Sequence, residues 1–60
     1  MDDATKELIS HCMKEARYGW TNYLDGKMGA GSEYAHLTMV AAILRNALGH
    51  IEQYVATVKP

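Results

Sequence analysis

Apolar residues recur at alternating spacings of three and four through the second half of the chain. These residues, called the seam below, are Tyr34, Leu37, Ala41, Leu44, Leu48, Ile51, Val55 and Val58. A series that repeats every seven residues without a charged interruption is typical of an α-helix that packs lengthwise on another helix. The seam therefore predicts a helix over residues 32–58, and no part of the chain shows the alternating pattern of a β-strand.

The first half of the chain repeats this pattern less strictly and predicts a helix over residues 3–25. Its apolar series is Ile9, Met13, Ala16, Trp20 and Tyr23. We expect Asp3 to cap the helix N-terminus, with Glu7 favoured by the helix dipole. Gly26 suits the left-handed residue that ends a helix. Three of the five glycines lie within residues 26–31, so we expect a connecting loop there, and Ser32 can cap the second helix.

The predicted fold is all-α: an antiparallel two-helix hairpin that forms a single domain over residues 1–60. Matching apolar series on two long antiparallel helices predict that the two series pack on each other as a left-handed hairpin.

The apolar surface of the second helix is wider than one partner helix covers, because Val40, Ala47 and Tyr54 flank the seam. A chain of 60 residues also has little room for a core, and the lone Cys12 excludes an internal disulfide. A homodimer in which two hairpins form a four-helix bundle would cover this apolar surface and enlarge the core. The predicted dimer interface contains Val40, Ile43, Leu44, Ala47, Leu48, Ile51, Tyr54 and Val55. The same apolar excess also suits a different protein, so both partners stay open.

Small residues recur seven apart in the first half, at Cys12, Gly19 and Gly26. A glycine inside a helix lowers helix stability by about 1 kcal/mol relative to alanine. We therefore expect that the packing at Gly19 requires a residue without a side chain. We expect close approach to large residues of the facing helix, such as Val40 and Tyr54. The alternative is a groove for a side chain of a partner.

Aromatic residues gather near the predicted loop. The predicted partner-binding residues are Tyr18, Trp20, Tyr23 and Tyr34, because tyrosine and tryptophan dominate interface hot spots. The alternative is that Trp20, Tyr23 and Tyr34 close the end of the bundle. Tyr18 lies off the apolar series and should be exposed.

Residues with catalytic or metal-binding chemistry do not form a recognisable set. Glu7, His11 and Glu15 lie four apart, and Glu33 and His36 have the Glu-x-x-His spacing of di-iron bundles, but the further core carboxylates of such sites are missing. Surface ion pairs explain these residues better. The glycine-rich segment lacks the sequence pattern of a phosphate-binding loop. The sequence also does not place a particular histidine beside Cys12, as a catalytic cysteine would require. We expect no metal, no cofactor, no small-molecule substrate and no enzymatic activity.

Two resemblances supply alternative functions. The segment from Arg45 to His50 resembles the Arg-polar-x-x-x-His signature of the HEPN ribonucleases, which implies RNA cleavage by Arg45 and His50 at a dimer interface. A homodimer of hairpins is similar to the Rop family of plasmid RNA-binding proteins, which implies an RNA-binding face. The first helix has more acidic than basic residues, so nucleic-acid binding is less favoured than protein binding.

The remaining expectations concern location and role. Met1 is followed by two aspartates and no apolar run approaches the length of a membrane span, so we expect a cytoplasmic protein without membrane contact. The favoured function is a small protein–protein interaction module: an adaptor, antitoxin-like regulator or phage-encoded inhibitor that docks on a partner protein.

Overall fold

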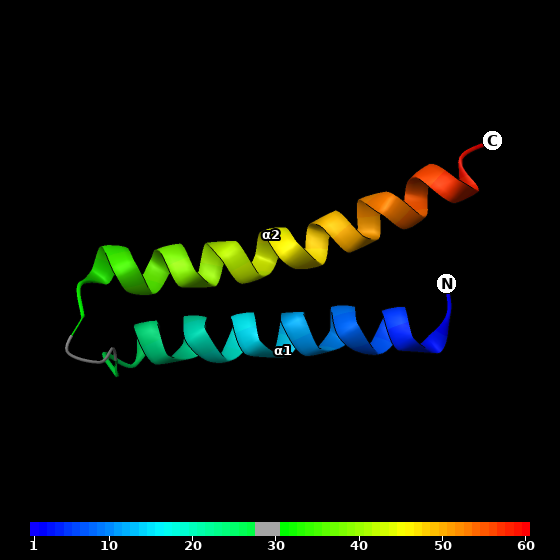
Figure 1. Ribbon diagram of the computed structural model, residues 1–60. Coiled ribbons are helices and arrows are strands. Elements are labelled where there is room, and N and C mark those ends of the chain that lie inside the picture. Colours follow the sequence, from blue (N-terminus) through cyan, green and yellow to red (C-terminus); the bar gives the residue numbers. More distant parts are fainter. Residues whose placement is uncertain (28–30) are drawn as a thin grey trace.

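Two antiparallel helices form the protein in the computed structural model, which describes residues 1–27 and 31–60 (Figure 1). Helix α1 spans Asp3–Leu24 and helix α2 spans Glu33–Val58. The molecule measures 46 × 19 × 14 Å, and both termini lie at one end of it. No strand occurs in the described ranges. The predicted helical hairpin is confirmed; part of the predicted loop, residues 28–30, lies outside the described residues.

The N-terminus of α1 is capped by Asp2, whereas the sequence predicted Asp3. The Asp2 carboxylate accepts a hydrogen bond from the Thr5 backbone N–H at 2.8 Å. Hydrogen bonding by the Thr5 side chain and backbone lowers the pKa of the Asp2 carboxyl. The prediction was one residue late, because the cap needs a carboxylate three positions before a free N–H, and Asp3 already lies in the first turn.

The other two helix-end predictions are confirmed. Gly26 has φ = 70°, and the N–H groups of Gly26 and Lys27 bond back to the carbonyl oxygens of Tyr23 and Asn22 at 3.1 and 2.8 Å. This is the Schellman arrangement, in which the left-handed residue lets the chain satisfy the last carbonyls of the helix. Ser32 caps α2, where its hydroxyl accepts from the Ala35 N–H at 3.1 Å.

Small side chains form the contact between the helices. Among the residues that the structure describes, the buried ones are Cys12, Ala16, Gly19, Val40 and Ala47, and no large side chain is fully buried. A Cβ placed on Gly19 would lie 2.8 Å from Val40 Cγ2. The predicted close approach of Val40 to Gly19 is therefore confirmed, and Val40 fills the space that a partner side chain would need.

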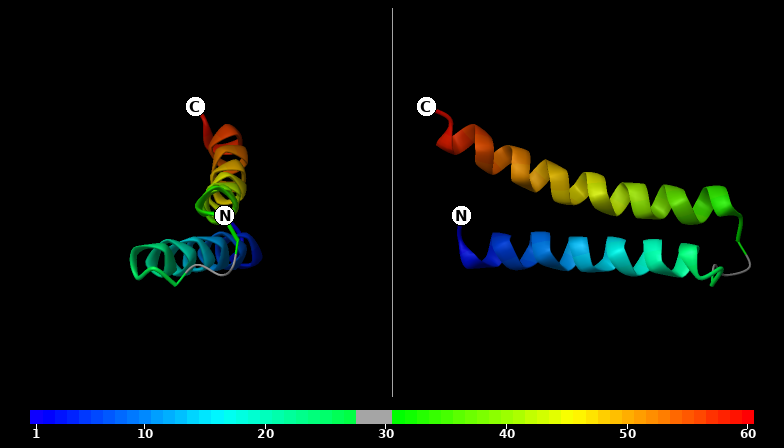
Figure 2. Two further views of the ribbon diagram at one scale, coloured as in Figure 1. Left: turned by 90° about the vertical axis from the view of Figure 1, so that its left-hand side faces the viewer. Right: turned by 180° about the vertical axis from the view of Figure 1, so that it is seen from behind.

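The helices diverge toward the termini, as two further views show (Figure 2). At this open end the Met1 amino group donates to the Tyr54 hydroxyl at 2.7 Å. An open groove of about 470 Å³ separates the helices there, and its lining residues are Met1, Asp2, Thr5, His50, Gln53, Tyr54 and Thr57. Tyr54 thus contacts the start of the chain, not the small residues of α1 that the sequence suggested. Among the described residues, neither helix combines the length and hydropathy that a membrane span requires.

Candidate protein-docking face

The seam of α2 is largely exposed, although the sequence predicted that it packs on the first helix. Leu48 and Val55 are 53% and 56% exposed, and Leu44 and Val58 are exposed to a similar extent. Helix α1 instead contacts the neighbouring stripe of α2 that contains Val40 and Ala47. The physical reason is close approach: Gly19 leaves room for Val40, and the small residues Ala16 and Ala47 are buried in the same contact.

This finding also revises the predicted dimer interface. Val40 and Ala47 are buried within the hairpin, and Ile43 and Tyr54 are half-buried. The uncovered members of the predicted interface are Leu44, Leu48 and Val55, together with the half-buried Ile51. The expectation that α2 carries more apolar surface than α1 can cover is confirmed by these exposures.

Helix α1 extends the uncovered apolar surface across the hairpin. A shallow groove of about 290 Å³ runs between the helices on this side, and its lining residues are Met13, Ala16, Arg17, Trp20, Val40 and Leu44. Met13 and Trp20 are each about half exposed, and Arg17 is the one charged residue of the lining. We call the seam together with Met13 and Trp20 the seam face.

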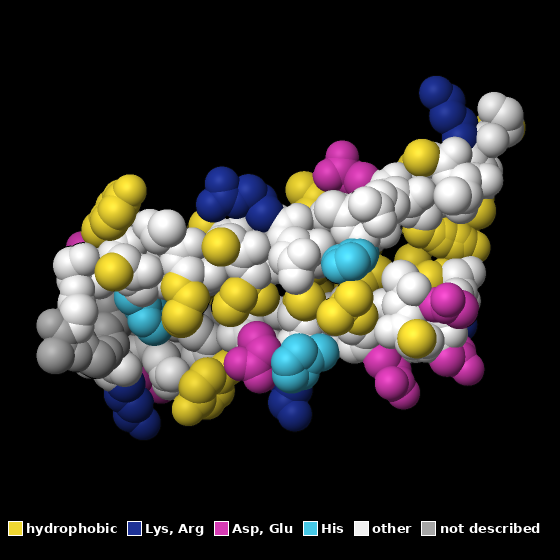
Figure 3. Space-filling model, viewed as in Figure 1, with side chains coloured by type: hydrophobic (Ala, Val, Ile, Leu, Met, Phe, Trp, Pro, Cys, Tyr) yellow, Lys and Arg dark blue, Asp and Glu magenta, His cyan; other side chains and the backbone are white. Residues whose placement is uncertain are grey.

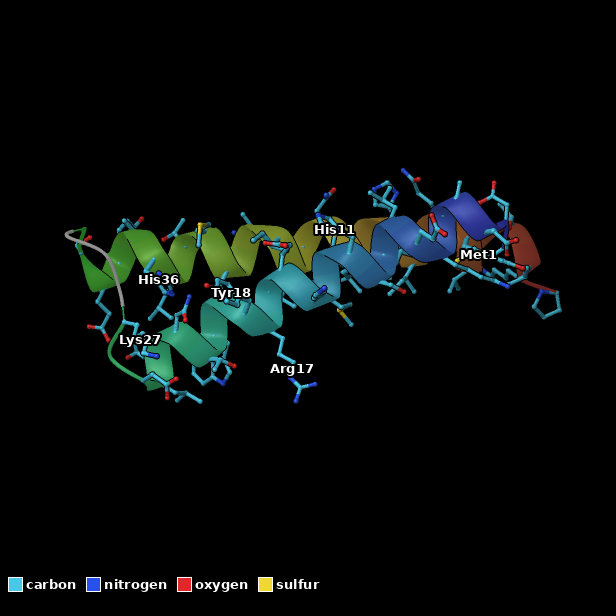
Figure 4. All side chains as sticks on the ribbon, turned by 90° about the horizontal axis from the view of Figure 1, so that it is seen from below. Met1, His11, Arg17, Tyr18, Lys27 and His36 are labelled. Carbon is cyan, nitrogen blue, oxygen red and sulfur yellow. The ribbon has the colours of Figure 1, made fainter. Side chains whose placement is uncertain are left out.

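The opposite side of the hairpin has a different character. Figure 4 shows that His11 and Arg17 project to opposite sides of α1, and Arg17 lines the groove beside Met13 and Trp20. Figure 3 shows acidic and basic side chains along α1 and hydrophobic side chains along the junction of the two helices. On this side, charged side chains therefore flank the apolar junction of the hairpin.

An aromatic cluster holds the loop end of the hairpin together. Trp20 stacks on Tyr23 with ring centroids 5.3 Å apart, and Tyr23 stacks on His36 at 6.4 Å. His36 donates from Nε2 to the Gly19 carbonyl oxygen at 2.7 Å, which fixes the ring between the helices. This cluster orients Trp20, whose side chain remains 47% exposed at the edge of the seam face.

Tyr23 also bonds to the first turn of α2. Its hydroxyl donates to the Glu33 carboxylate, and this hydrogen bond, with the negative charge of Glu33, raises the pKa of Tyr23. Ionising the phenol would remove the donor and place two negative charges together. Glu33 therefore serves as a hydrogen-bond acceptor between the helices.

Two of the four aromatic residues predicted to bind a partner, Trp20 and Tyr34, belong to the seam face, and the other two do not. Tyr23 is half-buried. Tyr18 is 68% exposed on the outer surface of α1, beside Lys14, Glu15 and Thr21. Tyr34, at the start of α2, is 80% exposed. The predicted exposure of Tyr18 is confirmed, but its position separates it from Trp20.

The residues of the ribonuclease resemblance lie on different faces of α2. Arg45 is exposed, while His50 is half-buried and lines the groove at the open end. The helix continues through Gly49 without interruption, so side chains five residues apart point about 140° apart. Within one hairpin, Arg45 and His50 therefore do not converge on a common substrate position.

Metal-binding geometry is not formed in the part of the chain that the structure describes, where no three histidine, cysteine or acidic residues come together. Cys12 is buried, with its sulfur 3.7 Å from the Asn46 amide nitrogen. Comparison with family models, with curated proteins and with solved structures finds no match for this chain. The seam face is therefore the feature of the hairpin that points most directly to a function.

Proposed function

We propose that the protein is a small, non-enzymatic interaction module that regulates another protein by docking on it through the seam face. The observation that supports this proposal is the exposure of most of the seam along α2, including Leu44, Leu48 and Val55, with Trp20 nearby on α1. Contiguous apolar surface of this kind is uncommon on a monomeric protein unless it meets a partner. Adaptor, regulator and inhibitor are all roles that such docking serves.

Covering the seam face supplies binding free energy. Fully burying one leucine, valine or methionine side chain is worth about 1.5–3 kcal/mol, so a half-exposed one gains about 1 kcal/mol. Leu44, Leu48, Val55, Val58 and Met13 are all about half exposed. Their combined gain falls within the 4–15 kcal/mol that association costs, so a partner must also engage Trp20 or other contacts to bind tightly.

Trp20 is the residue best placed to anchor a partner. It is large, held by its stack on Tyr23, and half exposed beside an apolar groove. A side chain that is already fixed loses little entropy on binding, which is a property of interface hot spots. Tyr18 supplies a matched comparison, because it is an aromatic residue of the same helix on a different surface.

Affinity capture with three tagged proteins tests the proposal: the wild type, Trp20→Ala and Tyr18→Ala. The proposal is supported if a protein recovered with the wild type binds it again when both are purified, and if Trp20→Ala alone loses this binding. Recovery of the same protein by all three, or of none by the wild type, would contradict docking through the seam face.

A further inference from the structure

We propose that a second copy of this chain covers the seam from Ala41 to Val58, in an antiparallel arrangement that sets Arg45 of each copy beside Glu52 of the other. The inference deepens the proposed docking function, on which it rests, by naming one occupant of the seam face. In such a dimer Leu44, Leu48, Val55 and Val58 meet the second copy, and a different protein docks on the rest of the seam face, which includes Met13, Trp20 and Tyr34.

The small core of the hairpin is the first argument for a second copy. Within residues 1–27 and 31–60 no large side chain is fully buried, and the buried set consists of one cysteine, two alanines, one glycine and one valine. A chain of this size without a disulfide has only a small core of its own, so additional apolar burial would add substantially to its stability. A second copy is present whenever the protein is made, whereas a different partner supports folding only when that partner is present.

Charges along the edge of the seam are the second argument. Arg45, Glu52 and Lys59 lie seven residues apart, are all exposed, and border the seam on the flank away from α1. Figure 3 shows basic, acidic and basic side chains in succession along this edge of α2. Because α1 occupies the other flank, two α2 helices that pair through their seams bring these charged edges together only when they run antiparallel.

The order of the charges selects one antiparallel register. With Arg45 opposite Glu52 of the second copy, the two-fold axis relates two such oppositely charged pairs. A shift of seven residues in either direction would instead place Arg45 opposite Arg45, or Glu52 opposite Glu52 and Arg45 opposite Lys59. Exposed ion pairs contribute little affinity, so the charges select the register and the seam supplies the attraction.

The same register aligns the seam itself. Leu48 then packs against Ile51 of the second copy, Leu44 against its Val55, and Ala41 against its Val58. Leu48 and Ile51 lie nearest the two-fold axis, at the centre of the interface. The apolar layers are therefore compatible with the register that the charges select, and a shift of seven residues would align apolar layers as well, so the charges alone distinguish the registers.

Sedimentation of the wild type and four variants tests the proposal. The wild type should be a dimer, and Leu48→Glu should dissociate it, because each copy would bring a carboxylate to the centre of the interface. The matched control is Ala42→Glu, which adds the same charge at an exposed position of α2 off the seam. Arg45→Glu should raise the dimer Kd about tenfold, and Arg45→Glu combined with Glu52→Arg should restore it.

A second measurement covers the case in which Leu48→Glu fails to fold. The Tm of a dimer that unfolds to separate chains should rise by about 5 °C for each tenfold increase in wild-type concentration. A monomeric wild type with a constant Tm overturns the proposal, as does a double charge variant no better than the single one. These measurements test only the dimer. The proposed function is tested separately, by whether Trp20→Ala loses binding to the protein that the wild type captures.

Discussion

Val40 lies directly against Gly19, so close that a Cβ on Gly19 would be 2.8 Å from Val40 Cγ2. Valine in a helix has one strongly preferred rotamer, and rotation therefore does not relieve this overlap. We predict that Gly19→Ala destabilises the protein by about 1 kcal/mol, because overpacking costs more than the gain in helix propensity. Urea denaturation followed by circular dichroism measures the change in the free energy of unfolding.

Gly49 provides the control for that experiment. It also lies inside a helix, but a Cβ placed there would meet nothing within 4 Å. Gly49→Ala should therefore stabilise the protein by up to about 1 kcal/mol through helix propensity alone. If the two substitutions change stability in the same direction, the tight contact between Gly19 and Val40 is not what holds the helices at this distance.

Asp2 caps α1, and we predict that Asp2→Ala reduces stability at neutral pH more than Asp3→Ala does. Asp3 makes only an exposed ion pair with Lys6 at 3.9 Å. Because folding lowers the pKa of Asp2, the contribution of Asp2 is present above the ordinary aspartate pKa of about 4 and is lost as the pH falls through the lowered value. Thermal unfolding at several pH values should show the wild type and Asp2→Ala converging in acid. A difference that persists below that range would exclude the cap as its cause.

The bond from Tyr23 to Glu33 predicts a response to alkaline pH. Because folding raises the pKa of Tyr23, its contribution is complete below the ordinary tyrosine pKa of about 10 and is lost as the pH rises through the raised value. An NMR titration of the Tyr23 ring should find a lower pKa in Glu33→Gln than in the wild type. Glu52→Gln is the control and should leave the titration unchanged, since Glu52 lies on an exposed part of α2.

Tyr18 and Trp20 should differ in their effect on stability. Tyr18 is 68% exposed on the outer surface of α1, so Tyr18→Ala should change the free energy of unfolding by less than about 0.5 kcal/mol. Trp20→Ala removes a half-buried ring and its stack on Tyr23, which should cost about 1–2 kcal/mol. Chemical denaturation of both variants measures these changes in the free energy of unfolding. Equal losses for the two variants would contradict the different environments of the two rings.

The helices and most of their ends were predictable from the sequence because they depend on local chemistry. The repeat of apolar residues, the hydroxyl of Ser32 and the conformational freedom of Gly26 each act within a few residues of the structure they determine. The cap at Asp2 was missed by one position because two aspartates stand side by side, and only the backbone geometry shows which one reaches the free N–H of Thr5.

The side of α2 that faces α1 was not predictable from hydrophobicity. The seam holds the larger apolar residues, so the pattern favours it as the internal contact, yet the helices meet through Ala16, Gly19, Val40 and Ala47. Close approach between small residues determined this choice. The available signal was the recurrence of Cys12 and Gly19 seven residues apart, opposite Val40 and Ala47, which are also seven apart.

Because different residues of α2 form the hairpin contact and the exposed seam, evolution can alter one without disturbing the other. Under the proposed docking, substitutions among large apolar side chains at Leu44, Leu48 and Val55 would alter what the seam binds, while Val40 and Ala47 keep the two helices in contact. A library that varies those three positions among large apolar residues should therefore retain the hairpin contact and differ in binding.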